Sequence, residues 1–308
     1  MKIVVLDGHT LNPGDNPWDS VAKFGELTIH DYTPADKVVE RSSDADIIIT
    51  NKAPLSAEAL SKLSQLKFIA VTATGYNVVD ISAARARGIP VANVPAYSTD
   101  SVAQFTFALI LELAHRVGHH DSAIHSGKWS AQPHFSFWDT LQVELAGKTL
   151  AIIGYGQIGK RVAKIAEALG MKVLTAGRDR TKVREIVASA DVITLHCPLT
   201  ADNTGLINRD FLALMKPTAF LINAARGGLV VEQDLADALN VETIAGAAVD
   251  VVSVEPIKPD NPLLKARNCI ITPHIAWASL AARQRLMRAT AENIRVFLAG
   301  KPINIVNL

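Results

Sequence analysis

Short apolar runs rich in β-branched residues alternate with helix-forming stretches along the whole chain, and this alternation constrains the fold most strongly. In the first half the apolar runs lie at 2–6, 27–30, 46–50, 67–72 and 90–93. Continuous apolar runs indicate strands that are buried on both faces, as the strands of a parallel sheet are. Parallel neighbours need a crossover between them, and the crossover is usually a helix. The first half therefore predicts βαβ units around an open α/β sheet.

The same alternation restarts at Lys148. Further apolar runs follow at 149–153, 172–175, 191–195, 219–223, 245–250 and 268–272. Their number matches a complete doubly wound dinucleotide-binding sheet. Because a chain of 308 residues is long enough for two domains of ordinary size, we expect two parallel-sheet domains.

Between these halves the pattern changes. A predicted helix near 100–116 is apolar almost all round, so we expect it to be buried. The segment 118–146 that follows contains several His and Trp residues and has no clear period. An irregular stretch of this length inside a compact domain is usually a functional segment or an interface.

Composition and charge exclude several classes of protein. The 31 basic and 30 acidic residues nearly cancel, so no global field favours nucleic acid or an anionic membrane. The two cysteines, Cys197 and Cys269, are too few for a disulfide scaffold or a four-cysteine zinc site. No apolar run reaches the roughly 18 residues of a membrane span, and the opening MKIVVLDGHT lacks the features of a signal peptide. We expect a cytoplasmic protein that binds neither nucleic acid nor a membrane.

The segment 147–160, GKTLAIIGYGQIGK, combines a predicted strand, a glycine-rich turn and a helix start. Gly154 allows a tight turn, Gly156 lets the backbone approach a pyrophosphate, and Gly159 lets the helix pack closely on the strand. The free N–H groups of the helix start, at Gln157 and Ile158, favour a phosphate. In this setting the motif predicts a dinucleotide site.

The end of the next strand should read the adenosine ribose. An acidic residue there favours NAD, but this strand ends at Gly177 and is followed by Arg178. Because a guanidinium suits a 2′-phosphate, we expect a NAD(P) coenzyme with NADP(H) favoured over NAD(H). In the alternative, Arg178 stacks on adenine or is solvated, and Asp179 binds the ribose hydroxyl.

Polar residues follow three of the later predicted strands. Arg226 comes after 219–223, Glu255 lies beyond the run that ends at Asp250, and His274 comes after 268–272. Ligands of open α/β sheets bind at the carboxyl ends of the strands. Hydride transfer to a 2-keto acid needs a cation for the carboxylate, a proton donor, and a carboxylate that keeps this donor charged. Each residue alone has an ordinary structural interpretation, but together Arg226, His274 and Glu255 predict an active site.

The histidines of the irregular segment raise the alternative of a metal site. His115, His119, His120, His125 and His134 lie close together in sequence. No cysteines or paired carboxylates accompany them to complete a ligand set. We therefore expect no metal, and interpret these histidines as interface residues.

These motifs together resemble the D-isomer-specific 2-hydroxyacid dehydrogenases, and most closely their glycerate dehydrogenase/hydroxypyruvate reductase branch. The resemblance extends over essentially the whole chain. The matching stretches are ATGYNVVD at 73–80, YSTDSVAQFTFALIL at 97–111, SFWDT at 136–140, GKTLAIIGYGQIG at 147–159, LHCPLT at 195–200, INAARGGLV at 222–230, GAAVDVVSVEP at 246–256 and TPHIAWAS at 272–279.

The resemblance implies roles for individual residues. It implies that Arg226, Glu255 and His274 are catalytic and that Asp250 contacts the nicotinamide carboxamide. The remaining implied contacts are the nicotinamide ring with Asn223, Ala224 and Ala225, the adenosine side with His196, Cys197 and Pro198, and the substrate carboxylate with Thr74, Gly75 and Tyr76.

The resemblance also implies an architecture and an assembly. A Rossmann dinucleotide-binding domain at 99–283 would be inserted into a flavodoxin-like substrate domain formed by 1–98 and 284–308. The segment at about 118–146 would be the arm of a homodimer. Trp138 of this arm would reach the partner's active site, or would be a buried interface residue.

The activity that follows is reduction of a small 2-keto acid to the D-2-hydroxy acid, with hydroxypyruvate/D-glycerate first and glyoxylate/glycolate second. Two alternatives remain open at this stage. One is a dinucleotide-sensing protein like the transcriptional co-repressors that share this fold, and the other is a dehydrogenase for a different 2-hydroxy acid. A panel of keto acids with both reduced coenzymes distinguishes them.

Overall fold

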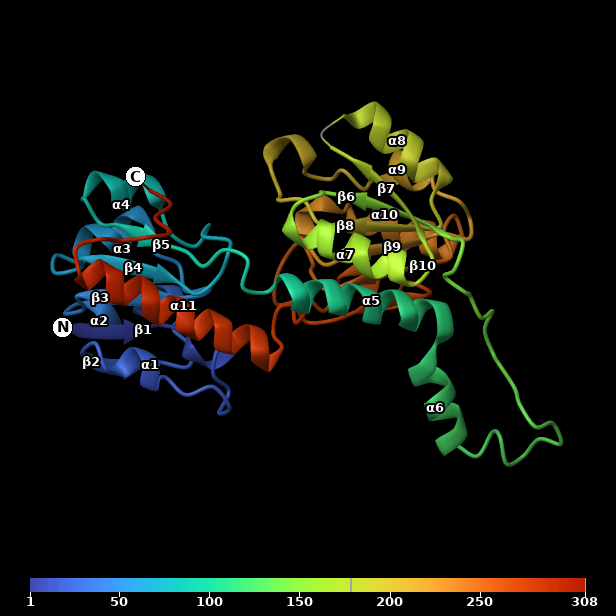
Figure 1. Ribbon diagram of the computed structural model, residues 1–308, viewed down its shortest axis with the longest axis horizontal. Helices are drawn as coiled ribbons and strands as arrows, with labels where there is room; N and C mark the ends of the chain where they lie inside the picture. Colours follow the sequence, from blue (N-terminus) through green and yellow to red (C-terminus); the bar gives the residue numbers. More distant parts are fainter. Residues whose placement is uncertain (178, 308) are drawn as a thin grey trace. The chain divides into compact units, whose positions relative to one another are not determined.

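The computed structural model describes residues 1–177 and 179–307 and contains two compact units (Figure 1). Unit 1 is formed by Met1–Ser98 together with the chain from Trp277 onward, and unit 2 by Thr99–Ala276. The chain thus leaves unit 1, builds the whole of unit 2, and returns. The return falls at Trp277, earlier in the chain than the expected residue 284.

Unit 1 is built on a five-stranded parallel sheet in the order β2-β1-β3-β4-β5. The strands β1, β3, β4 and β5 have buried side chains, as the sequence predicted, whereas the edge strand β2 is mostly exposed. Ile3 and Val5 belong to one core, whereas Val4 and Leu6 belong to the other, because successive side chains of a strand point to opposite faces. The strands are β1 (Lys2–Val5), β2 (Glu26–Ile29), β3 (Ile47–Thr50), β4 (Phe68–Val71) and β5 (Val91–Ala92).

Helices cover both faces of this sheet. The helices α1 (Asp19–Ala22) and α11 (Leu280–Leu298) contribute to one core, and α2 (Val38–Ser42), α3 (Ala57–Lys62) and α4 (Ile81–Ala86) contribute to the other. Figure 1 shows α11, which comes from the end of the chain, lying along the strands from its beginning. Unit 1 is therefore a doubly wound fold whose strand order reverses between β1 and β3.

Unit 2 contains a six-stranded parallel sheet in the order β11-β10-β9-β8-β6-β7. The chain moves outward from β6 to β7 and then resumes at β8 on the other side of β6. The strand order thus reverses between β6 and β8, where sheets of this kind bind their ligands. The strands are β6 (Thr149–Ile153), β7 (Lys172–Ala176), β8 (Val192–Leu195), β9 (Phe220–Asn223), β10 (Gly246–Val249) and β11 (Cys269–Ile271).

The helices of unit 2 also form two layers. The long helix α5 (Thr99–His115) packs with α7 (Gln157–Ala168) on one face, and its apolar residues are buried as expected. The other face is covered by α8 (Arg180–Ser189), α9 (Arg209–Leu212) and α10 (Glu232–Asn240). These two layers confirm the predicted Rossmann-like fold of the second half.

The segment after α5 differs from the sequence expectation. We expected irregular chain from residue 118, but the structure contains a helix, α6 (Val117–His125), before the loop at 126–146. None of the residues of α6 is buried, so its apolar side chains form no stripe that the sequence could reveal. Figure 1 shows α6 and the loop extending away from the sheet of unit 2. We call 117–146 the arm.

Candidate active site

The glycine-rich turn after β6 has the features that a dinucleotide needs. Gly154 has a φ of +100°, and a Cβ there would lie 2.4 Å from the backbone nitrogen of Cys197. A Cβ at Gly159 would lie 2.3 Å from the carbonyl oxygen of Gly154. Glycine is therefore required at both positions by close packing of the backbone.

Gly156 is different, because it faces open space. A Cβ there would meet no atom within 4 Å in the part of the chain that the structure describes. Gly156 is the N-cap of α7, and no side chain among the described residues caps the start of this helix. The N–H groups of Gln157 and Ile158 thus lie at a bare helix start that is positioned for an anion. The turn fits the pyrophosphate of a dinucleotide.

The end of β8 packs directly under this turn. Both ring nitrogens of the half-buried His196 are shielded from solvent, and neither has a hydrogen-bond partner among the described residues. Burial lowers the pKa of His196 to about 4, so the ring is neutral at ordinary pH. Cys197 and Pro198 follow it, and the side chain of Asn203 donates to the Pro198 carbonyl at 2.8 Å. This places the predicted adenosine-side residues beside the glycine turn.

The strand end that reads the ribose is only partly described. Gly177 follows β7, and Arg178 lies outside the described residues. Asp179 caps α8, where its Oδ1 accepts from the backbone N–H groups of Thr181 and Lys182 at 2.9 and 3.2 Å. One oxygen of the carboxylate that we considered for the ribose hydroxyl is thus already engaged in the helix cap.

His274 and Glu255 form an ion pair beyond the sheet edge of unit 2. Their Nδ1 and Oε2 atoms are 2.7 Å apart. His274 has a φ of +56°, a left-handed conformation in which histidine is more frequent than most residues. Because Nδ1 faces the carboxylate, Nε2 is the nitrogen left for a substrate.

Asp250, at the end of β10, holds the loop that carries His274. Its carboxylate is buried and accepts from Thr272 Oγ1 at 2.7 Å and from the N–H groups of Ile275 and Ala276 at 2.9 Å. Its carbonyl accepts from the His274 N–H at 2.8 Å. Burial raises the pKa of this carboxyl, and these hydrogen bonds oppose the rise. Asp250 thus positions the loop of His274 through these hydrogen bonds, and this role does not depend on a contact with nicotinamide.

Arg226 follows β9, the strand next to β10 in the sheet. The side chain of Asn223 fixes this loop, because it donates to the Arg226 carbonyl and accepts from the Ala225 N–H, both at 3.0 Å. The Arg226 guanidinium is exposed and donates to the carbonyl of Ala225 at 2.7 Å. The loops that carry Arg226, Glu255 and His274 therefore leave neighbouring strands at the same edge.

The predicted substrate residues of unit 1 lie in the loop after β4. Asn93 donates to the Thr74 carbonyl at 2.8 Å, and Thr74 Oγ1 donates to the Val94 carbonyl at 3.0 Å. Asn51 holds the start of this loop through a 2.6 Å bond to the Thr72 carbonyl. The loop is thus fixed by its neighbours, while Thr74 and Tyr76 remain exposed and Gly75 is half-buried.

Asp7 lies near the predicted substrate residues of unit 1 at the end of β1, and the sequence analysis missed it. Its buried carboxylate accepts from the backbone N–H groups of Asn51, Lys52 and Ala53, and so shapes the turn after β3. The signal was available, because Asp7 follows the first apolar run as Asp250 follows a later one.

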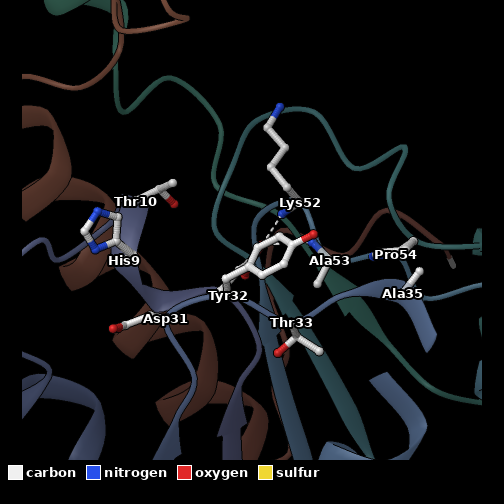
Figure 2. Close-up of a pocket in the computed structure, with 10 residues that line it drawn as sticks. His9, Thr10, Asp31, Tyr32, Thr33, Ala35, Lys52, Ala53 and Pro54 are labelled. Carbon is white, nitrogen blue, oxygen red and sulfur yellow. Dashed lines mark hydrogen bonds between the residues drawn. The ribbon is translucent and has the colours of Figure 1, made fainter. Parts of the chain in front are cut away.

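A pocket of about 390 Å³ lies over this turn, where the strand order of unit 1 reverses (Figure 2). Figure 2 shows the Lys52 side chain extending from the turn and the Tyr32 ring lying across the middle of the view. The lining residues are Asp7, His9, Thr10, Asp31, Tyr32, Thr33, Ala35, Lys52, Ala53 and Pro54. Thr74, Gly75 and Tyr76 do not line this pocket.

Two histidines of the arm, His119 and His120, have ordinary protein partners. His119 Nε2 lies 3.0 Å from Asp139, and His120 Nε2 accepts from the Asp139 N–H at 3.2 Å. Lys128 and His119 hold the pKa of the Asp139 carboxyl below its usual value. Within residues 1–177 and 179–307, no group of three or more His, Cys, Asp or Glu side chains is placed to hold a metal ion. Over the same residues, no helix is long and apolar enough to cross a membrane.

A glycine cradle for a dinucleotide and a paired histidine and glutamate at the same sheet edge define a nicotinamide-dependent dehydrogenase. Comparison with known proteins gives the family. Residues 107–276 match the family model described as D-isomer specific 2-hydroxyacid dehydrogenase, NAD binding domain. The chain belongs to the D-isomer specific 2-hydroxyacid dehydrogenase family.

Individual relatives match over nearly the full length. The chain is 49% identical to the hydroxypyruvate reductase of Blautia hydrogenotrophica over 100% of both chains. It is 42% identical to the glycerate dehydrogenase of Methylorubrum extorquens over 99% of this chain and 98% of that protein. A solved NADPH-dependent glyoxylate/hydroxypyruvate reductase from Sinorhizobium meliloti, in complex with NADP and malonate, superimposes with a TM-score of 0.83 at 26% identity, covering 99% of this chain and 96% of that one.

Proposed function

We propose that this protein reduces hydroxypyruvate to D-glycerate with reduced NAD(P), and reduces glyoxylate to glycolate as a second reaction. The observation that carries the proposal is the 2.7 Å pair of His274 and Glu255, which lies at the same sheet edge as Arg226. The names of the 49% and 42% identical relatives support the choice of substrate.

The residues divide the chemistry among them. The coenzyme, held by the turn at Gly154, Gly156 and Gly159, supplies the hydride for the keto carbon when it is bound. Arg226 binds the substrate carboxylate and polarises the carbonyl, because its guanidinium is the cation of the set. His274 donates a proton from Nε2 to the carbonyl oxygen as this oxygen gains charge. Glu255 orients the ring through its hydrogen bond with Nδ1, and the product leaves as the 2-hydroxy acid.

The two units divide the binding. We assign the substrate domain to unit 1, where Thr74, Gly75 and Tyr76 hold the substrate carboxylate with their backbone. Unit 2 is the coenzyme domain, with Asn223 to Ala225 and Asp250 on the nicotinamide side and His196 to Pro198 on the adenosine side. We also assign the protein to the cytoplasm, a reducing compartment in which free thiols such as those of Cys197 and Cys269 persist.

A matrix of coenzymes and keto acids tests this function. The purified protein is assayed with NADH and NADPH against hydroxypyruvate, glyoxylate, pyruvate and a branched-chain 2-keto acid. Hydroxypyruvate should have the highest kcat/KM, with glyoxylate next. Binding of the coenzyme without turnover of any keto acid would contradict the proposal and indicate a dinucleotide-sensing protein.

We further propose that the coenzyme is NADP(H) rather than NAD(H). The end of β7 carries Gly177 instead of an acidic residue, and Asp179 uses Oδ1 to cap α8. Arg178 supplies the cation that a 2′-phosphate needs. The ratio of the two kcat/KM values for NADPH and NADH tests this preference.

We also propose that the arm joins two copies of this chain. Phe135, Trp138 and Leu141 expose 90%, 68% and 81% of their surface, which is unusual for large apolar side chains. The unaltered protein should be dimeric by light scattering, and a Phe135→Ser/Leu141→Ser double variant should be monomeric. If Trp138 enters the partner's site, Trp138→Ala raises the KM for hydroxypyruvate in a protein that remains dimeric.

A further inference from the structure

The loop between β10 and the short helix η5 (Pro262–Lys265) carries Glu255. This loop is exposed at Ser253, Val254 and Glu255. Side chains supply hydrogen-bond acceptors for its backbone, since the Ser253 N–H donates to Glu232 and the Val252 N–H lies 3.4 Å from Glu255 itself. The position of the Glu255 carboxylate therefore depends on how this loop is anchored.

Glu232, in the first turn of α10, is that anchor. Its Oε1 accepts from the Ser253 N–H at 2.6 Å, and its Oε2 accepts from Ser253 Oγ at 2.8 Å and from Asn261 Nδ2 at 2.9 Å. Ser253 lies two residues before Glu255 and Asn261 lies at the far end of the loop. One carboxylate thus joins both ends of the segment that carries Glu255.

The dipeptide Val252–Ser253 at the start of this segment also packs against the loop that carries Arg226. A Cβ at Gly227 would lie 1.9 Å from the carbonyl carbon of Val252 and 2.4 Å from the nitrogen of Ser253. The backbone after Arg226 is therefore in direct contact with Val252 and Ser253. Because Glu232 also binds Ser253, it helps to fix the spacing between the Arg226 loop and the Glu255 loop.

We propose that Glu232 is a positioning residue for the reaction: it holds Glu255 where Glu255 can pair with His274. This inference rests on the proposed function, because it assigns Glu232 to the proton-donating pair of that reaction. The hydrogen bonds of Glu232 go to Ser253 and Asn261. Its effect is transmitted through Ser253, and displacement of a reacting group by about 1 Å can reduce a rate on the order of 100-fold.

The alternative is that Glu232 only stabilises the start of α10. Asp234 provides the matched control, because it lies in the same first turn and its Oδ2 accepts from the Arg209 N–H at 2.9 Å. This bond holds the start of α9 and does not touch the Glu255 loop. Replacing Asp234 removes a similar carboxylate from the same helix end without affecting Ser253.

The test compares Glu232→Ala, Glu232→Gln and Asp234→Ala with the unaltered protein. We expect Glu232→Ala to lower kcat for hydroxypyruvate about 10- to 100-fold with a change in coenzyme Kd of less than about 2-fold. Glu232→Gln keeps an acceptor for Ser253 and should recover part of kcat. Asp234→Ala should lose stability alone.

Amide exchange of the coenzyme-free protein separates this proposal from the proposed function. Exchange in 252–261 should accelerate in Glu232→Ala and remain unchanged in Asp234→Ala, whatever the substrate is. If the unaltered protein reduces no keto acid, the proposed function is wrong. The exchange data would then still show whether Glu232 holds the loop that carries Glu255. If Glu232→Ala keeps the exchange rates and kcat of the unaltered protein, the positioning role is wrong. Ser253→Ala, which removes one of the three bonds, provides the same readouts if Glu232→Ala does not fold.

Discussion

The Nδ1 atom of His274 lies 2.7 Å from the Oε2 atom of Glu255, and the two residues come from loops that follow neighbouring strands. Asp250 fixes the histidine side of this pair through Thr272, Ile275 and Ala276. Glu232 fixes the glutamate side through Ser253. The pair is therefore held by two carboxylates that do not themselves take part in proton transfer.

Replacing His274 by Gln should remove the proton donor and leave the coenzyme site intact. We expect kcat for hydroxypyruvate to fall about 100- to 10,000-fold, the range in which a positioned acid contributes. The glycine turn lies at β6, away from β11, so the coenzyme Kd should change little. Steady-state kinetics and a fluorescence titration with NADPH measure both values. Retention of most of the turnover would show that another group donates the proton.

Replacing Arg226 by Ala should affect substrate binding as well as the rate. The guanidinium is the cation that binds the carboxylate and polarises the carbonyl, so KM should rise steeply and kcat should fall. Arg226→Lys keeps the charge without the two-pronged contact and should recover only part of the loss. A variant with lower kcat and an unchanged KM would contradict a role in substrate binding.

Replacing Gly177 by Asp should shift the coenzyme preference toward NAD(H). A Cβ at Gly177 meets no described atom within 4 Å, so the aspartate can be accommodated. Its carboxylate would repel a 2′-phosphate and accept from a 2′-hydroxyl. We expect the NADPH to NADH ratio of kcat/KM to fall at least about 10-fold, which corresponds to about 1.4 kcal/mol. The control is Lys172→Asp, because Lys172 is exposed and lies in the same strand, β7. Gly170 cannot serve as the control, since its φ of +75° would strain any other residue.

His196 should make the protein less stable in acid. Burial lowers its pKa in the folded state to about 4, below the usual value of about 6.5 in an unfolded chain. The unfolded chain thus binds more protons between these values, so stability rises with pH across this window and is lost as pH falls from about 6.5 to 4. The full loss is on the order of 3 kcal/mol.

The measurement is the free energy of unfolding by urea at several pH values for the unaltered protein and for His196→Leu. Titration of the carboxylates is common to both proteins, so the difference between the two curves isolates His196. The unaltered protein should lose about 3 kcal/mol more than the variant across this window. Parallel curves would show that the ring has a partner when charged.

Much of the fold could be predicted from the sequence because a parallel sheet buries both faces of its strands. Apolar runs such as Ile47–Thr50 and Phe68–Val71 therefore marked the strands directly. The glycine turn and the residues after β9 and β11 were predictable because polar groups and glycines stand where these runs stop. Helix α6 was not predictable, because its residues are exposed and carry no stripe.

The supporting contacts were harder to predict because each depends on a long-range approach. Asp7 holds a turn more than forty residues later in the chain, and Glu232 holds Ser253, which lies in a different loop. The place of Asp7 after the first apolar run was a signal, but nothing in the local sequence of Glu232 distinguishes it from a solvated acid. Their roles follow only from the way in which the parallel strands bring their loops to one edge.

The kcat for NADPH-dependent reduction of hydroxypyruvate, measured for the unaltered protein and for Glu255→Gln, tests the central claim most directly. Because the Glu255 carboxylate lies 2.7 Å from Nδ1 of His274 and orients the ring, kcat should fall about 10- to 100-fold in the variant, while the coenzyme Kd changes by less than about 2-fold. An unchanged kcat in the variant, or no reduction of hydroxypyruvate by the unaltered protein, would contradict the account.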